Sequence, residues 1–361
     1  MNNAATLIEQ WCEQVREAAR TGQRLRLRGG GSKDFWGAAS AQTLELSTCA
    51  LTGITSYEPS ELVITARAGT PLQELEAELA RHGQCLAFEP PHFGPRATLG
   101  GAVACGLSGP ARASVGALRD YVLGVQCING SGQLLSFGGQ VMKNVAGYDV
   151  SRLLTGSMGT LGLILEVSIK VLPRPVAQQS LQFEMTQEQA LHQLNVWGGQ
   201  PLPLSASCWH NGLLAIRLSG AQAAVDAAIT KMGGNALPEP EKFWDRLREQ
   251  EHAFFDGVLQ DKEQGLWRLS VPSVAPVLNL QGEQCIEWGG AQRWLKTTAC
   301  AAEIRAVAEQ LGGHATLFKG GDKSVGVFHP LQPAVERIHR NLKNAFDPAG
   351  IFNPGRMFTN F

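Results

Sequence analysis

The glycines of this chain are concentrated in one stretch of the sequence. Of the 41 glycines in 361 residues, 15 lie between Gly94 and Gly162. They follow no three-residue period, so a collagen-like chain is excluded. Because glycine lacks a Cβ, such a stretch can form tight turns and can bring its backbone very close to another group. We therefore expect a fold in which the glycine-rich region either turns sharply or approaches a ligand.

The composition indicates a globular protein with no electrostatic preference for nucleic acid. Apolar residues make up 44% of the chain and charged residues 17%, which is typical of chains that bury a core. The 31 basic and 32 acidic residues leave a net charge of −1, so neither a nucleic-acid surface nor a polybasic membrane patch is indicated. At about 150 residues per domain, the length predicts two domains.

The cysteines and the N-terminus point to a reducing compartment. The eight cysteines are dispersed and no pair has C-x-x-C spacing, so we expect no metal site and no iron–sulfur cluster of the ferredoxin type. The interpretation we favour is that they are reduced, buried apolar residues. Neither a signal peptide nor an apolar run of bilayer length is visible, and we expect a cytoplasmic protein, with any membrane contact made through partners.

The first half of the chain is predicted to contain both helices and strands. Hydrophobic periodicity and turn residues predict helices and strands. Helices are expected over Thr6–Thr21, with Leu7, Trp11, Val15 and Ala18 on one face, and from an N-cap at Thr70 to a stop at Gly83. Strands are expected over Arg24–Arg28, Leu62–Ala66 and Leu161–Val171, and a hairpin pairs Val122–Asn129 with Gln133–Phe137.

A proline pair at Pro173 and Pro175 marks a predicted boundary. Residues 176–330 then alternate strand-like and helix-like runs, which predicts an α+β domain with an antiparallel sheet. Residues 331–361 contain a predicted helix, Val335–Phe346, with Ile338 and Leu342 facing inward. The predicted domains are thus 1–175, 176–330 and a C-terminal segment, 331–361.

Three segments in the first domain could carry chemistry. Gly29–Lys33 follows a strand and could turn its amides toward one anionic group, although a surface turn is an equally good interpretation. Ala97–Pro110 is small and uncharged, which suits a ligand or close helix packing. Lys143–Asp149 and Leu153–Ile164 follow, with Gly156, Gly159 and Gly162 at a spacing of three, and this pattern alone could be a bulged loop.

Taken together and in order, these segments resemble the FAD-binding domain of the vanillyl-alcohol oxidase/para-cresol methylhydroxylase superfamily (PCMH type). The matching motifs are R-G-G-G, A-T-L-G-G, R-D-Y-V-L-G, K-N-V-A-G-Y-D, G-S-M-G-T-L-G-L-I and a tail F-D-P-A-G-I-F-N-P-G-R-M. They lie at Arg28–Gly31, Ala97–Gly101, Arg119–Gly124, Lys143–Asp149, Gly156–Ile164 and Phe346–Met357. The resemblance implies an α+β fold, with two α/β subdomains binding FAD and a ferredoxin-like cap domain over 176–330.

The resemblance also implies which residues bind FAD. The Gly29–Lys33 loop and the Thr98–Gly101 turn would wrap the diphosphate, and the tail at Asn353 would return toward the isoalloxazine. The full set that it implies is Arg28, Gly29, Gly30, Gly31, Ser32, Lys33, Pro91, Thr98, Leu99, Gly100, Gly101, Cys105, Gly106, Gly109, Asp120, Gly156, Gly159, Thr160, Gly162, Ile164 and Asn353.

The chain departs from the superfamily pattern at three places. Ser32 stands where some relatives attach FAD through histidine, so a non-covalent flavin is expected. Met158 replaces a glutamate, which removes one acceptor. Relatives carry a motif in the cap domain that supplies metal ligands and a catalytic base, and its histidine pair is absent around Lys319–Ser324. His314, His329, Arg356 and Lys319 are the remaining weak candidates for a catalytic role.

Motifs at Glu287–Trp294 and Gly313–Thr316, with the tail, are similar to those of the small FAD-binding subunits of glycolate oxidase (glycolate dehydrogenase) complexes. This resemblance implies oxidation of glycolate to glyoxylate beside a larger FAD-binding subunit and an iron–sulfur subunit, to which electrons pass. Two alternatives stay open: a self-sufficient FAD-dependent 2-hydroxy-acid dehydrogenase, as for D-lactate, and a non-catalytic assembly subunit.

Overall fold

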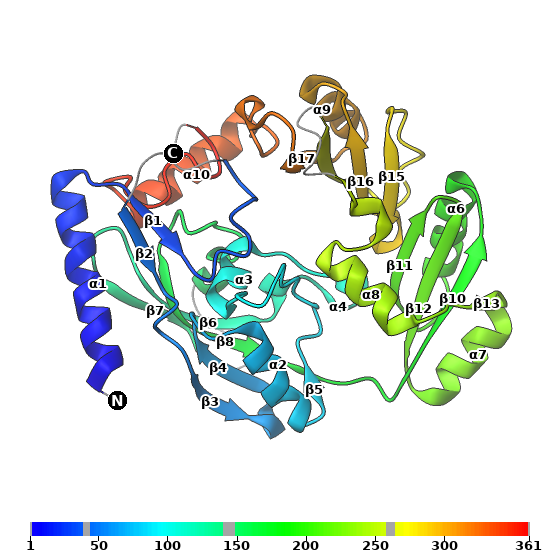
Figure 1. Ribbon diagram of the computed structural model, residues 1–361, viewed down its shortest axis with the longest axis horizontal. Coiled ribbons are helices and arrows are strands. Elements are labelled where there is room, and N and C mark those ends of the chain that lie inside the picture. The colour runs from blue at the N-terminus through cyan, green and yellow to red at the C-terminus, as the bar shows by residue number, and fades with distance from the viewer. Residues whose placement is uncertain (1, 39–43, 140–148, 258–263, 360–361) are drawn as a thin grey trace.

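The computed structural model in Figure 1 describes residues 2–38, 44–139, 149–257 and 264–359. Two lobes lie side by side. The N-terminal lobe is built on a five-stranded sheet, and the cap lobe is built on an eight-stranded sheet. The expected α+β class is confirmed. The boundaries at 175 and 330 stay a prediction; Pro173 and Pro175 lie between the two sheets in sequence.

The five-stranded sheet of the N-terminal lobe is antiparallel throughout, in the order β3-β4-β8-β6-β7. Its strands are β3 (Ile54–Glu58), β4 (Val63–Arg67), β6 (Val122–Ile128), β7 (Leu134–Gly138) and β8 (Leu163–Lys170). Helices α2 (Leu72–Arg81) and α3 (Leu99–Cys105) contribute Leu75, Leu79 and Val103 to the same core. The predicted β6–β7 hairpin is confirmed.

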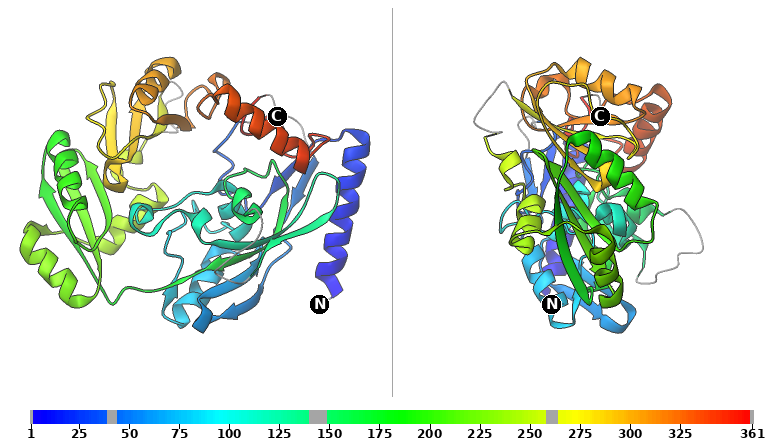
Figure 2. Two further views of the ribbon diagram at one scale, coloured as in Figure 1. Left: turned by 180° about the vertical axis from the view of Figure 1, so that it is seen from behind. Right: turned by 90° about the vertical axis from the view of Figure 1, so that its right-hand side faces the viewer.

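A parallel pair, β1 (Leu25–Arg28) and β2 (Leu44–Ser47), lies beside helix α1 (Asn2–Thr21). The predicted stripe of α1 is buried: Trp11, Val15 and Ala18 pack in one cluster with Leu25 and Phe352. Figure 2 shows α1 along the outer side of this lobe, away from the cap lobe. Helix α1 therefore packs against β1, and the glycine loop, Gly29–Lys33, follows directly after β1.

The start of α2 differs from the prediction by one residue. Pro71, not Thr70, occupies the N-cap position and makes no side-chain cap bond. The Thr70 hydroxyl instead accepts a hydrogen bond from the Gly53 amide at 3.0 Å. The prediction was wrong because a tertiary partner competed for the hydroxyl. The end of α2 is as expected, with Gly83 in the left-handed region at a φ of 66°.

Short elements complete the N-terminal lobe. They are α4 (Arg112–Val115), α5 (Val150–Leu153), and the antiparallel pair β5 (Gln84–Cys85) and β9 (Leu172–Pro173). Of the predicted segment Lys143–Asp149, only Asp149 lies within the described residues, where its carboxylate accepts from the Arg152 amide and caps α5.

The cap lobe has the strand order β13-β10-β12-β11-β15-β16-β14-β17 and is antiparallel. Its strands are β10 (Ala177–Glu184), β11 (Leu204–His210), β12 (Leu213–Gly220), β13 (Asn235–Ala236), β14 (Gly265–Ser270), β15 (Glu283–Glu287), β16 (Gln292–Thr297) and β17 (His314–Gly320). Its helices are α6 (Gln187–Gly198), α7 (Gln222–Met232), α8 (Pro240–Glu249) and α9 (Ala301–Gln310). The predicted alternation of strands and helices is confirmed.

The chain then returns to the N-terminal lobe through α10 (Pro333–Phe346). Leu342 packs against the core as predicted, but the prediction for Ile338 was wrong, because this side chain is 63% exposed. The tail after α10 runs beside β1, where the Leu25 amide donates to the Ile351 carbonyl at 2.8 Å. The tail therefore closes the N-terminal lobe next to the glycine loop.

Candidate functional site

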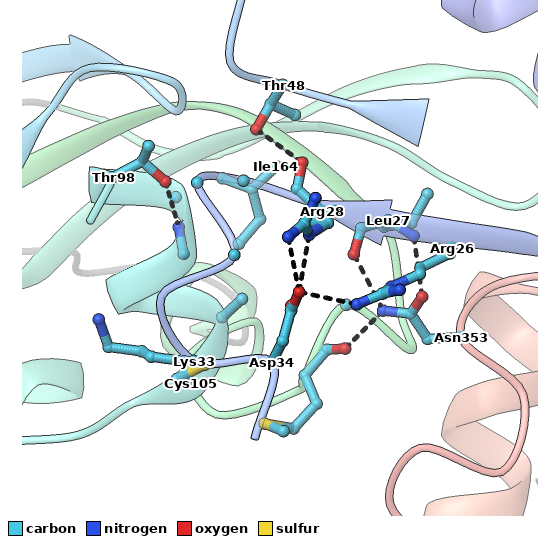
Figure 3. Close-up of a pocket in the computed structure, with 18 of the residues that line it drawn as sticks. Arg26, Leu27, Arg28, Lys33, Asp34, Thr48, Thr98, Cys105, Ile164 and Asn353 are labelled. Carbon is cyan, nitrogen blue, oxygen red and sulfur yellow. Dashed lines mark hydrogen bonds and ion pairs between the residues drawn. The ribbon is translucent and has the colours of Figure 1, made fainter. Parts of the chain in front are cut away.

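A pocket of about 830 Å3, including its open mouth, lies where β1, α3, the segment before β8 and the tail meet. Three of the segments singled out in the sequence contribute to its wall, and Figure 3 shows their side chains converging on it. The lining residues used below, called the main pocket, are Arg26–Asp34, Thr48, Thr98, Gly100, Gly101, Ala104, Cys105, Met158, Gly159, Gly162–Ile164, Asn353 and Arg356.

The glycine loop presents unpaired amides to the main pocket. Within the described part of the chain, the backbone N–H groups from Gly29 to Lys33 donate to no acceptor. The carbonyls of Gly31 and Lys33, by contrast, accept from the amides of Asp34 and Trp36. Because each amide aimed at a charged oxygen forms a bond worth about 1.5–3 kcal/mol, this loop can bind an anion.

The glycines of this loop are needed for packing against the protein. A Cβ on Gly30 would lie 1.5 Å from the Arg96 carbonyl oxygen, and one on Gly29 would lie 2.5 Å from Thr98 Oγ1. Gly31 has a φ of 75°, in the left-handed region. The expected reason for the glycines, clearance for a ligand, is therefore incomplete: their small size first lets the loop lie against Arg96 and Thr98.

Helix α3 forms the wall facing the loop. Thr98 is its N-cap, and the hydroxyl accepts from the Gly101 amide at 3.2 Å (Figure 3). Gly100 packs on Ala68, where a Cβ would lie 2.6 Å from the Ala68 Cβ. Small residues within Ala97–Pro110 thus do both things that the sequence suggested: they pack closely on the protein, and they line the main pocket.

Asn353 joins the tail to the pocket walls. Its side-chain oxygen accepts from the Leu27 amide at 2.8 Å, and its nitrogen donates to the Met158 carbonyl at 2.7 Å (Figure 3). A Cβ on Gly159 would lie 2.6 Å from that nitrogen. The Asn353 amide is therefore engaged by the protein, so it shapes the main pocket by positioning β1 and the Met158 turn.

Charged side chains surround the loop. Asp34 pairs with Arg26 at 2.8 Å and with Arg28 at 2.7 Å (Figure 3). Lys33 is buried, and this burial lowers the pKa of its amine. Arg356 donates to the carbonyls of Ala38 and Asp34, at 2.9 and 3.1 Å. Among the lining residues, four cations accompany one carboxylate, and Arg28 pairs in addition with Glu45 at 3.4 Å. The remaining excess of positive charge favours a ligand that bears negative charge.

The structure brings most of the sequence-predicted residues together. Those in the main pocket are Arg28, Gly29, Gly30, Gly31, Ser32, Lys33, Thr98, Gly100, Gly101, Cys105, Gly159, Gly162, Ile164 and Asn353. Pro91 and Gly109 line a second pocket, between the lobes.

Five predicted residues line neither of these pockets. Leu99 is buried in the lobe core, and Gly106 and Gly156 pack against each other, with a Gly106 Cβ 3.0 Å from the Gly156 nitrogen. The Asp120 carboxylate accepts from the Ala117 amide at 2.9 Å, and the buried Thr160 hydroxyl donates to the Ser157 carbonyl at 2.7 Å. Each of these five residues therefore packs against, or hydrogen-bonds to, other parts of the protein.

The catalytic candidates do not form one cluster. Arg356 lines the main pocket. His329 is engaged by Glu309 at 3.0 Å, and burial lowers the pKa of His314, at the start of β17. The Lys319 amine lies 4.6 Å from the ring centre of Phe35, and burial lowers its pKa to about 8.

Sequence reasoning missed several residues of the main pocket. Arg26, Asp34 and Met158 line it, although Met158 was discussed only as a lost acceptor. Arg26 and Asp34 flank the glycine loop, and their opposite charges were the available signal. Thr48 was missed because it lies next to β1 only in the folded chain, where β2 pairs with β1. There the Thr48 amide donates to the Arg28 carbonyl at 2.9 Å.

The main pocket fits a diphosphate-bearing cofactor on these observations. Free amides lie on one wall, small residues leave space on the opposite wall, and cations stand at the rim. A flavin or adenine ring system needs apolar walls, which Leu27, Ala104 and Ile164 provide. Within the described residues, no group of three metal-ligating side chains occurs, and none of the helices there has the length and apolar character needed to cross a bilayer.

Comparisons with known proteins agree with this geometry. Residues 4–138 match the family model described as an FAD binding domain. The chain is 49% identical to the glycolate oxidase subunit GlcE of Escherichia coli over 349 residues, which is 96% of each protein. It is 35% identical to a D-lactate dehydrogenase of Archaeoglobus fulgidus over 150 residues, 41% of this chain and 33% of that protein.

A solved structure, that of an alkyldihydroxyacetonephosphate synthase, has the same fold. It superimposes with a TM-score of 0.64 at 16% identity, covering 96% of this chain and 75% of that one. The superposition spans both lobes, so the two proteins share the fold of both lobes despite their low sequence identity.

Proposed function

The chain belongs to the family of the glycolate oxidase subunit GlcE and has an FAD binding domain, and from this premise we propose that it is the FAD-binding subunit of a glycolate-oxidising complex. The complex would oxidise glycolate to glyoxylate. The observation that carries the proposal is the set of free amides at Gly29–Lys33 that line the main pocket. Identity over 96% of both chains extends the proposal to the cap lobe.

The residues that would hold the cofactor follow from the main pocket. The Gly29–Lys33 amides would donate to the diphosphate, and Arg28 and Lys33 would add positive charge. Asn353 would keep β1 and the Met158 turn in register around the cofactor. When bound, FAD supplies the capacity to accept two electrons from an alcohol carbon. Ser32, whose hydroxyl offers no ring nitrogen, supports a non-covalent flavin.

We also propose that electrons pass from this chain to partner subunits. A larger FAD-binding subunit and an iron–sulfur subunit would complete the assembly. The name of the E. coli relative supports a multi-subunit protein, and the cysteines are dispersed in sequence without a C-x-x-C pair. None of the eight cysteines, all of which lie within the described residues, forms a disulfide; four are buried as expected, whereas Cys49 and Cys300 are exposed. An acceptor on another chain would therefore receive the electrons.

Affinity purification of the tagged chain from native extract tests this proposal. We expect FAD bound to the chain, two further subunits, iron in the complex, and glycolate-dependent dye reduction by the complex only. Turnover of glycolate or D-lactate by the isolated chain would instead favour a self-sufficient dehydrogenase. A colourless chain that binds no added FAD would favour an assembly subunit and overturn the proposal.

A further inference from the structure

One side of helix α10 is left without cover by the rest of the chain. The helix has fourteen residues, all of them described, and Lys343 alone is buried. Its apolar residues Val335, Ile338, Leu342 and Phe346 follow one another at spacings of three or four positions, so they form one stripe along the helix. A helix in a globular protein gains most of its stability by burying such a stripe. The exposed part of α10 is therefore a candidate contact surface.

The two halves of this stripe have different surroundings. Leu342 and Phe346 pack against the core of the N-terminal lobe. Val335 and Ile338, by contrast, are 41% and 63% exposed. Figure 1 shows that α10 begins on the side of the cap lobe, near β17, and ends over the N-terminal lobe, near β1. The uncovered half of the stripe, Val335 and Ile338, is called the α10 patch below.

Lys343, on the inner side of α10, joins this helix to two walls of the main pocket. Its amine donates to the carbonyls of Thr160 and Phe352, at 2.7 and 2.9 Å. The residues next to these two carbonyls in sequence, Gly159 and Asn353, line the main pocket. The α10 patch ends five residues before Lys343, which is about 7.5 Å along a helix axis at 1.5 Å per residue. A protein bound to the α10 patch would therefore lie close to the wall of the main pocket.

The unpaired charge beside the α10 patch is positive. Arg337, next to Ile338, is exposed and makes no ion pair or side-chain hydrogen bond with the described residues. Arg340 pairs with Glu336 at 2.6 Å, and Glu336 is the one carboxylate of α10. One cation is thus left without a partner beside the apolar side chains. A complementary surface presents apolar side chains with a carboxylate next to them.

Two other occupants fit this surface less well. A second copy of the chain, docked about a two-fold axis, would bring Arg337 toward its own counterpart, and like charges oppose association. An anionic lipid surface is recognised by clusters of about four to eight Lys and Arg residues. Helix α10 has three such residues, of which Lys343 is buried and Arg340 is paired. A protein surface that is both apolar and acidic is therefore the occupant that the α10 patch favours.

We propose that the α10 patch binds the partner subunit that accepts electrons from this chain, the proposed iron–sulfur subunit, through apolar side chains and a carboxylate of that partner. This docking site rests on the proposed function, and it deepens that function by giving the electron acceptor a place on this chain. An acceptor must come close to the cofactor that supplies its electrons. The α10 patch meets this need, because it is exposed apolar surface on a helix that contacts the walls of the main pocket.

Competition for the partner tests the α10 patch. Tagged variants are produced in cells that also make the untagged wild-type chain, and iron, FAD and melting temperature are measured on the purified tagged chain. Ile338→Asp puts a charge at an exposed apolar position. We expect it to recover about 10- to 100-fold less iron than tagged wild type, as for a central interface residue, with unchanged FAD and melting temperature. Arg337→Glu, which removes no apolar contact, should also lower the iron, and Arg337→Lys should retain it.

Val176→Asp is the matched control, because Val176 is an exposed valine outside α10, next to the start of β10. It should recover as much iron as wild type. Photo-cross-linking then identifies the occupant directly. Replacing Ile338 by p-benzoylphenylalanine should link this chain to the subunit whose sequence carries the cysteine motifs of iron–sulfur clusters, and the same replacement at Val176 should not.

Four results would overturn this docking site. The first is a wild-type level of iron with both Ile338→Asp and Arg337→Glu. The second is a cross-link from position 338 to a different subunit or to a second copy of this chain. The third is loss of iron only with Val274→Asp, at an exposed valine of the cap lobe. The fourth is binding of wild type, but not of Ile338→Asp, to vesicles of phosphatidylcholine and phosphatidylserine. The proposed function fails by a different readout, a wild-type chain that recovers neither FAD nor iron.

Discussion

Adding one methyl group at Gly30 should abolish tight FAD binding. In Gly30→Ala, the new Cβ would lie 1.5 Å from the Arg96 carbonyl oxygen, and this oxygen belongs to backbone that cannot rotate away. Ordinary contact needs more than 3 Å, so the loop must move by roughly 1.5–2 Å. A shift of this size breaks amide–phosphate bonds, which tolerate only a few tenths of an ångström.

The magnitude follows from the number of bonds lost. If two amide–phosphate bonds fail, at about 1.5–3 kcal/mol each, the loss is roughly 3–6 kcal/mol. This corresponds to about 10²- to 10⁴-fold weaker binding. The assay is fluorescence titration of the apoprotein with FAD, with circular dichroism to show that the fold is retained.

Gly198→Ala is the matched control, because a Cβ there meets nothing within 4 Å and the backbone has an ordinary φ. It should bind FAD as wild type. If Gly30→Ala retained stoichiometric FAD with unchanged affinity, the diphosphate would lie elsewhere and the reasoning from the loop amides would be refuted.

Three further changes test the supports of the main pocket and the cap sheet. Asn353→Leu leaves the amide and carbonyl groups that it bridges without buried partners, and it puts a leucine at a φ of 42°, in the left-handed region; urea unfolding should show a loss of about 2–5 kcal/mol, and a loss below 1 kcal/mol would contradict the bridging role. Lys343→Met leaves the buried carboxylate of Asp347, now paired at 2.7 Å, without its cation, and should cost about 3–5 kcal/mol by the same assay; an equally stable variant would show that the pair contributes nothing. The pKa of Glu287 is raised to about 7 by burial, so the folded state binds more protons than the unfolded state between about pH 4.5 and 7, and this contribution to stability is lost as the pH rises through 7. Glu287→Gln should therefore flatten the decline between pH 5 and pH 8 by up to about 3 kcal/mol, whereas parallel curves for both proteins would contradict the raised pKa.

Local patterns in the sequence predicted much of the N-terminal lobe. The stripe of α1, the β6–β7 hairpin and the stop at Gly83 depend on neighbours within a few residues, and all three are present. The errors arose where distant residues compete. Thr70 bonds to Gly53 instead of capping α2, and Ile338 is exposed although its helix is amphipathic.

The same distinction applies to the site. The order of the glycine motifs indicated the loop and α3, because each motif is contiguous in sequence. The role of Asn353 as a bridge between β1 and the Met158 turn depends on the C-terminal tail returning to lie beside β1 in the folded chain. No local pattern contains that information.

A crystal structure of the chain grown with FAD tests the central claim most directly. The measured quantity is the distance from each diphosphate oxygen to the backbone nitrogens of Gly29–Lys33. The account predicts several of these distances at about 2.7–3.2 Å, with the ring systems between the β1 side and the α3 side of the main pocket. A diphosphate bound away from this loop, with the amides facing solvent, would contradict it.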